Sequence, residues 1–121
     1  MRIQALGDRD KPVIVMLPGS FCKSESLKYL YEKLAADYCI ILPEYNGHYE
    51  NSTFTTRQNE ASEIKEYIQQ NGIERIRMLY GQSMGAEVTI ELLRQLTEVH
   101  IEVDRCFLDG APCIKLSPLY K

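Results

Sequence analysis

The sequence lacks several features that mark whole classes of protein. Its longest aliphatic run, residues 13–17, is far shorter than the roughly 20 residues that a membrane-spanning helix needs. The 14 Lys and Arg nearly balance the 17 Asp and Glu, and no basic stripe favours a nucleic-acid partner. Residues 1–5 lack the apolar core of a signal peptide. We therefore expect a cytoplasmic protein with neither a membrane nor a nucleic acid as partner.

Cysteine and histidine are also scarce. The 4 cysteines include no Cys-x-x-Cys pair, and neither of the 2 histidines lies near a cysteine pair. We therefore expect reduced thiols, no bound metal and no cofactor. Cys39 and Cys106 lie within apolar runs, which predicts that both thiols are buried.

The chain also has no internal repeat, no low-complexity tract and no linker rich in Gly, Pro or Ser. Its 121 residues are 45% apolar and 26% charged, the proportions of a soluble globular protein rather than a disordered one. This length suits one hydrophobic core. Residues 1–121 are therefore expected to form a single domain.

Short apolar runs alternate along the chain with amphipathic segments. The runs cover residues 12–17, 38–42, 76–80 and 103–108, and helical patterns lie between them at 27–35, 61–68 and 88–99. This alternation predicts an α/β fold with three α/β/α layers around a mostly parallel sheet. Right-handed crossovers would then place the C-terminal ends of the parallel strands at one edge, where ligand sites gather.

Finer details can also be predicted from local patterns. Ser24 is placed to cap the first helix. Thr55 could begin a capping box for the second helix, and Asn71-Gly72 would end that helix. Pro43 is expected to stop the second strand. Residues 1–8 could form a leading strand that pairs as a hairpin with residues 13–17.

The pentapeptide at residues 81–85, Gly-Gln-Ser-Met-Gly, matches Gly-x-Ser-x-Gly between a buried strand and a helix, the setting of a nucleophile elbow. A sharp turn there would strain the backbone of Ser83, and Gly81 and Gly85 would leave room for the crossing strand and helix. The Met84 N–H would then point toward a developing oxyanion. The alternative is a Gly-Ser turn that only links strand to helix.

These segments resemble the N-terminal part of the α/β-hydrolase superfamily, and the resemblance covers nearly all of residues 12–112. Leu17-Pro18-Gly19-Ser20-Phe21 is similar to the family's His-Gly-x loop, with Pro18 in place of histidine. The loop at residues 43–49 is similar to its Pro-Gly-His-Gly turn, with Tyr49 in place of the second glycine. The resemblance implies that Gly19 is a motif glycine and that Ser20 donates the second oxyanion N–H, or Phe21 if the loop is shifted by one.

The sequence contains no convincing general base. His100 follows a helix of about 15 residues that begins at the elbow, so it would lie about 20 Å away, at the opposite edge. His48 falls on a turn position of the family pattern. Asp109, after the last apolar run, is a candidate acid, although a plain turn residue before Gly110 is the favoured interpretation. The resemblance implies that the catalytic histidine, and with it much of the triad, lies beyond Lys121. The chain is therefore expected to be part of a hydrolase and to be inactive alone.

The resulting hypothesis is a serine hydrolase that cleaves an ester, thioester or related acyl bond of a small-molecule substrate through an acyl-enzyme on Ser83. An acyltransferase could use the same elbow. A non-catalytic binding or assembly module is the third hypothesis. If residues 103–108 form an exposed edge strand, that edge could pair with a second copy of the chain.

Overall fold

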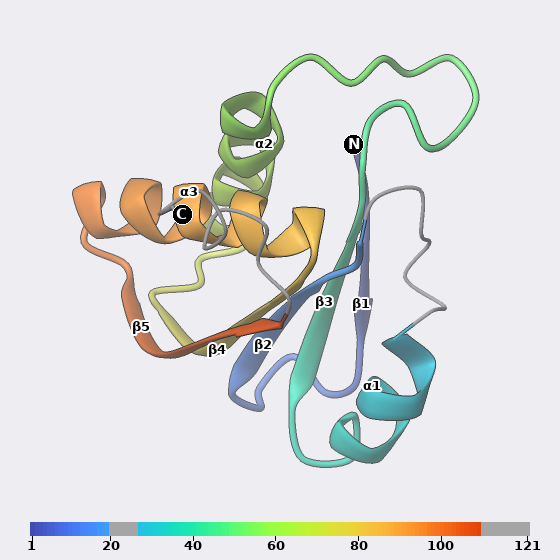
Figure 1. Ribbon diagram of the computed structural model, residues 1–121. Coiled ribbons are helices and arrows are strands. Elements are labelled where there is room, and N and C mark those ends of the chain that lie inside the picture. Colours follow the sequence, from blue (N-terminus) through green and yellow to red (C-terminus); the bar gives the residue numbers. More distant parts are fainter. Residues whose placement is uncertain (20–26, 110–121) are drawn as a thin grey trace, which may run out of the picture.

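The computed structural model describes residues 1–19 and 27–109 and contains one five-stranded sheet with helices on both faces (Figure 1). The elements follow in the order β1 (Arg2–Leu6), β2 (Val13–Leu17), α1 (Lys28–Leu34), β3 (Cys39–Glu44), α2 (Arg57–Gln70), β4 (Arg75–Gln82), α3 (Met84–Glu98) and β5 (Glu102–Asp109). The sheet order is β1-β3-β2-β4-β5. Strands β2 to β5 run parallel, and β1 runs antiparallel to β3. The predicted mostly parallel α/β fold is confirmed.

Two apolar clusters cover the two faces of the sheet. Figure 1 shows α2 and α3 together on one side and α1 on the other. The cluster beneath α2 and α3 includes the buried side chains of Ile64, Ile68, Leu92 and Leu96 against Val15 and Leu79. The cluster beneath α1 includes Leu27 and Tyr31 against Ile14, Met16, Ile40 and Tyr80. The three-layer arrangement follows from strands that bury side chains on both faces.

Strand β1 exists as predicted, but the predicted hairpin with β2 is wrong. Its partner is β3, in a register that runs from Arg2↔Glu44 to Leu6↔Ile40. At Gly7, with φ of 85°, the chain passes so close to the turn before β3 that a Cβ would lie 2.4 Å from the carbonyl oxygen of Tyr38. Because β2 is flanked by β3 and β4, it has no open side for β1, which pairs with the open side of β3 instead.

The prediction that Pro43 stops the second strand is also wrong. Strand β3 continues to Glu44, and Pro43 pairs with Ile3 of β1. The ladder between β2 and β3 ends earlier, at Val15↔Ile41. Proline lacks the N–H that a strand flanked on both sides needs. It is accommodated here because only one neighbouring strand pairs at this position.

The helix ends differ slightly from the predicted ones. Helix α2 is capped by Thr56 rather than Thr55, since the Thr56 Oγ1 accepts a hydrogen bond of 3.0 Å from the Asn59 N–H. Asn71 ends this helix and Gly72 follows with φ of 68°, as predicted. The predicted cap Ser24 lies outside the described residues.

The two cysteines predicted to be buried differ in their exposure. Cys39, at the start of β3, is 5% exposed, as predicted. The prediction that Cys106 is buried is wrong, because it lies on β5 at the end of the sheet order and its side chain is exposed. Within residues 1–19 and 27–109, no helix combines the length and the apolar character that a membrane span requires.

Candidate functional site

The turn between β4 and α3 holds Ser83 in a conformation that few residues adopt. Its backbone has φ of 55° and ψ of −117°, a strained combination for any residue with a side chain. Ser83 is exposed, at the carboxyl edge of the sheet, where β2, β3, β4 and β5 end. The strain that the sequence predicted at this serine is present.

Gly81 and Gly85 make this turn possible by leaving space for neighbouring backbone. A Cβ on Gly81 would lie 2.4 Å from Thr89 Oγ1 and 2.7 Å from the Ala86 Cα. A Cβ on Gly85 would lie 2.4 Å from the carbonyl oxygen of Leu17. Since Leu17 is at the end of β2, the missing side chain of Gly85 lets α3 begin directly beside the neighbouring strand.

The first turn of α3 lies at the serine. Met84 is the first residue of the helix, so its N–H belongs to the unpaired end of the helix, where the dipole is positive. The Ala86 N–H donates to the Ser83 carbonyl over 2.9 Å, which closes the first turn. Thr89 Oγ1 donates to the Gly85 carbonyl at 2.7 Å and tightens it further. A negative charge that develops near Ser83 would meet this positive end.

The segment after β2 is held close to the elbow from two sides. The carbonyl of Pro18 lies 2.5 Å from the position of a Cβ on Gly85, and it accepts a 2.7 Å hydrogen bond from the buried Tyr45 hydroxyl. Gly19 follows and is buried. The two candidates for the second oxyanion donor, Ser20 and Phe21, lie outside the described residues, so their role stays a prediction.

Asp109 ends β5 beside the elbow. It is the register partner of Gln82, and its backbone carbonyl accepts a 2.9 Å hydrogen bond from the Ser83 N–H. Its side chain Oδ2 accepts a 3.2 Å hydrogen bond from the Tyr80 hydroxyl. Burial, together with the charge of Asp109, raises the pKa of Tyr80 to about 12. The structure therefore brings Ser83 and the candidate acid together, whereas the role of Asp109 as an acid stays a prediction.

The two histidines lie at opposite edges of the sheet. His48 is half-buried in the loop after β3. Its backbone N–H donates a 3.1 Å hydrogen bond to the Tyr45 carbonyl, and its ring meets the Tyr45 ring edge-on, with 5.3 Å between the ring centroids. This is the turn position that the sequence indicated. His100 is exposed after the C-terminal end of α3, with φ of 62°, whereas Ser83 precedes the same helix.

A buried carboxylate that the sequence analysis missed fixes the loop carrying His48. Glu60 is fully buried, and its two oxygens accept hydrogen bonds from the backbone N–H and the side-chain amide of Asn46, at 2.9 Å and 2.8 Å. The same amide donates 2.7 Å to Glu63. The signal was in the sequence, because Glu60 falls four residues before Ile64 on the inner stripe of α2.

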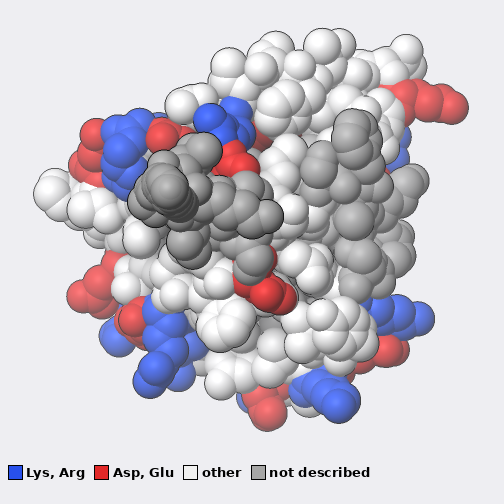
Figure 2. Space-filling model, viewed as in Figure 1, with Lys and Arg blue, Asp and Glu red and all other residues white. Residues whose placement is uncertain are grey.

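Two observations bear on the charged side chains of the described residues. Among the described residues, no group of three or more His, Cys, Asp or Glu is placed to hold a metal ion. Figure 2 shows acidic and basic side chains interspersed on the face in view.

Comparison with solved structures gives the fold of the chain. A protein of the alpha/beta hydrolase family from Desulfitobacterium hafniense is similar with a TM-score of 0.83 and 21% identity, over 91% of this chain and 44% of that one. An esterase from Exiguobacterium antarcticum is similar with a TM-score of 0.73 and 27% identity, over 90% and 40% of the two chains. The epoxide hydrolase CorEH gives 0.73 and 17%, over 88% and 36%. This chain thus spans less than half the length of each. No protein-family model matches the sequence.

Proposed function

We propose that the intact protein is a serine hydrolase that cleaves an ester, thioester or related acyl bond. The proposal proceeds from the α/β-hydrolase fold, of which this chain holds the N-terminal portion. The observation that carries the proposal is the strained backbone of Ser83, at φ of 55°, directly before α3. Such strain persists only where the surrounding structure imposes it, and it is concentrated at functional sites.

The proposed reaction begins when the Ser83 hydroxyl attacks the acyl carbon of a small-molecule substrate. The carbonyl oxygen becomes an oxyanion, which the Met84 N–H stabilises at the positive end of α3. Ser20 would supply the second N–H, or Phe21 if the loop is shifted by one. Collapse of the tetrahedral intermediate expels the alcohol or thiol and leaves an acyl-enzyme, which water then hydrolyses.

The identity of the nucleophile favours acyl over epoxide chemistry. Attack by a serine hydroxyl on an epoxide carbon would form an ether, which water does not readily cleave. Attack on an acyl carbon forms an ester, which water cleaves when a base assists it. An acyltransferase would use the same serine and oxyanion donors with an acceptor other than water.

Ser83 needs a base, since a free hydroxyl is a weak nucleophile at neutral pH. Neither histidine of the described residues is a convincing candidate, because His100 follows the far end of α3 and His48 occupies a loop turn. The proposal therefore places the catalytic histidine beyond Lys121. Asp109 is the candidate acid, and the Tyr80 hydroxyl would help to orient it.

Assembly through β5 is a second candidate function. This strand is last in the sheet order, and its Phe107 side chain is 58% exposed although it is a large apolar group. An edge strand with exposed apolar groups is a template for pairing with another chain. We infer that a second copy of this chain is the partner, and this role requires no catalysis.

A fluorophosphonate probe tests the hydrolase proposal. The 121-residue chain and a longer protein that continues past Lys121 are incubated with the probe, beside a Ser83→Ala variant of each and a Ser62→Ala control on α2. Intact mass should show one adduct in the longer protein, lost in Ser83→Ala and retained in Ser62→Ala. An adduct that survives in Ser83→Ala would overturn the assignment of the nucleophile.

A further inference from the structure

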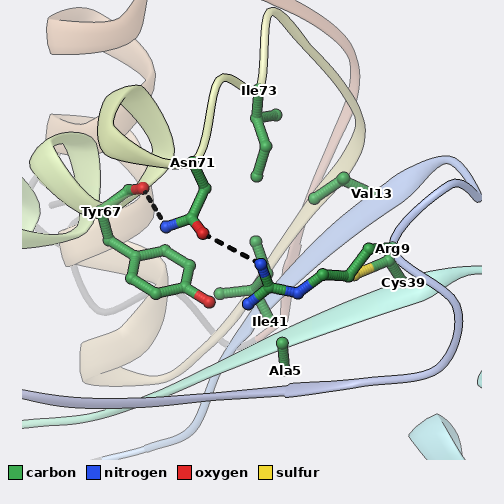
Figure 3. A pocket seen from close by; sticks show the side chains of 8 residues that line it. All are labelled: Ala5, Arg9, Val13, Cys39, Ile41, Tyr67, Asn71 and Ile73. Atoms are coloured by element: carbon green, nitrogen blue, oxygen red, sulfur yellow. Dashed lines mark hydrogen bonds between the residues drawn. The ribbon is translucent and has the colours of Figure 1, made fainter.

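A small cavity lies at the amino edge of the sheet, opposite Ser83. It is enclosed by the start of β2, the start of β3, the connection between β1 and β2 and the C-terminal end of α2, and its volume is about 50 Å³. Its floor is formed by the apolar side chains of Val13, Ile41 and Ile73 (Figure 3). The site at Ser83 makes no use of this space.

The mouth of the cavity carries a guanidinium group held in place. Arg9 Nη1 donates a 3.2 Å hydrogen bond to Asn71 Oδ1, and Asn71 Nδ2 donates 2.8 Å to the Tyr67 carbonyl at the end of α2. Figure 3 shows Arg9 extended across the cavity toward Asn71. A guanidinium has five N–H donors in a fixed plane, so this hydrogen bond leaves most of them for a ligand.

The electrostatic balance at the cavity favours an anion. Among the residues that the structure describes, no Asp or Glu lines it. The buried thiol of Cys39 lies on the cavity wall, and its pKa responds to both Arg9 and Asp8. Burial raises the pKa of Cys39 most. The charge of Arg9 lowers this pKa, and the charge of Asp8 raises it by a smaller amount. The cation therefore outweighs the carboxylate at the wall of the cavity.

The shape and the charge together define a ligand class. An engineered cavity of about 150 Å³ binds benzene, with six carbons, so a third of that volume suits a tail of roughly two carbons. An Arg guanidinium pairs with a carboxylate through two parallel hydrogen bonds. We propose that this cavity binds a short-chain monocarboxylate, with the tail on the apolar floor and the carboxylate on Arg9. This proposal does not depend on hydrolase activity at Ser83.

The apolar floor separates this ligand from inorganic anions. Phosphate or sulfate would place charge against the apolar side chains of Val13 and Ile41, which cannot replace its water of hydration. A long fatty acid would project a tail that the cavity cannot hold. Affinity should therefore be greatest near propionate and should fall for both chloride and hexanoate.

The test is a titration of the ¹⁵N-labelled 121-residue chain with sodium propionate at constant ionic strength, followed by NMR. Shifts should saturate at the amides of Cys39 and Ile73. Arg9→Gln should weaken binding roughly tenfold or more, because a charge-assisted hydrogen bond is lost. Arg9→Lys should retain part of the affinity, and Arg105→Gln, which removes an equal charge on β5, should change it less than twofold.

A cavity-filling variant and the alkylation of Cys39 test the proposal independently of the NMR titration. Ala5→Leu, which fills the cavity from β1, should abolish binding, and bound propionate should slow alkylation of Cys39 by iodoacetamide in the parent chain but not in Arg9→Gln. Shifts that do not saturate, equal affinity for propionate and hexanoate, or unchanged affinity in Arg9→Gln would each overturn the proposal.

Discussion

The backbone N–H of Ser83 donates a hydrogen bond to the backbone carbonyl of Asp109, with 2.9 Å between nitrogen and oxygen. The elbow is therefore fastened to the end of the neighbouring strand β5 as well as to its own helix. The bond holds the amide of the proposed nucleophile whatever the protonation state of the Asp109 side chain, because it uses only main-chain atoms. A shift at the end of β5 would move Ser83 with it.

Gly85→Ala should lower the free energy of unfolding by about 2–3 kcal/mol, because the new Cβ would overlap the end of β2. The clash is with the carbonyl oxygens of Leu17 and Pro18, which cannot move without disturbing the strand. Urea denaturation followed by circular dichroism measures this loss. Gly72→Asn is the matched control, since nothing lies within 4 Å of its Cβ position and Asn tolerates a positive φ. A Gly85→Ala variant as stable as the parent would contradict the packing described at the elbow.

Glu60→Gln should destabilise the fold by about 2–4 kcal/mol. The carboxylate now accepts hydrogen bonds from two N–H donors of Asn46. In the variant the new amide nitrogen would face one of these donors, so that two buried N–H groups would oppose each other. Denaturant unfolding of Glu60→Gln and of Glu66→Gln, an exposed position on the same helix, compares the two changes. If both variants lose the same stability, the buried network does not hold the loop that carries His48.

Tyr80 should make stability depend on pH in the alkaline range. Its pKa is raised from 10 to about 12 in the folded chain, so the stabilising contribution is complete below pH 10 and is lost as pH rises from 10 to 12. The contribution is about 3 kcal/mol at most, since the pKa rises from 10 to about 12 and each pKa unit corresponds to about 1.4 kcal/mol. The difference in unfolding free energy between the parent and Tyr80→Phe should shrink over this interval.

The corresponding spectroscopic measurement is phenolate absorbance. The ionisation of Tyr80 should appear as a late step near pH 12, and Tyr80→Phe should remove that step. Tyr38→Phe serves as control because it removes a different phenol and should leave the late step in place. A titration in which Tyr80→Phe retains that step would refute the assignment.

Phe107→Lys should abolish self-association of the chain if β5 pairs with a second copy. Sedimentation velocity over a range of concentrations should show a dimer for the parent and a monomer for Phe107→Lys. Tyr29→Lys, which changes a side chain that is 60% exposed on α1, should still dimerise. A parent chain that stays monomeric at the highest concentration would rule out this pairing.

The α/β-hydrolase fold could be predicted from the sequence because its signals are local. The runs of β-branched residues, the helical spacing of apolar residues and the Gly-x-Ser-x-Gly pentapeptide each lie within a short segment. The similarity to solved α/β-hydrolase structures confirms the resemblance at the level of the fold. The placement of Ser83 before a helix followed directly from that order.

The errors arose where the answer depends on contacts between distant segments. Whether residues 2–6 pair with β2 or β3 depends on which strand edge is open, and only the assembled sheet decides that. The exposure of Cys106 likewise depends on the position of β5 at the end of the sheet. The burial of Glu60 depends on a loop partner fourteen positions earlier, Asn46. Local propensity carries none of this information.

The pairing of β1 with β3 also sets an order of events during synthesis. Strand β1 is made first among the strands, but its partner in the register Leu6↔Ile40 is made only after α1. At about 5–20 residues per second, the 33 residues between Leu6 and Ile40 take about 2–7 s on the ribosome. During that interval the first strand has to wait unpaired. Both neighbours of β3, the antiparallel β1 and the parallel β2, can pair with it only once β3 has been made.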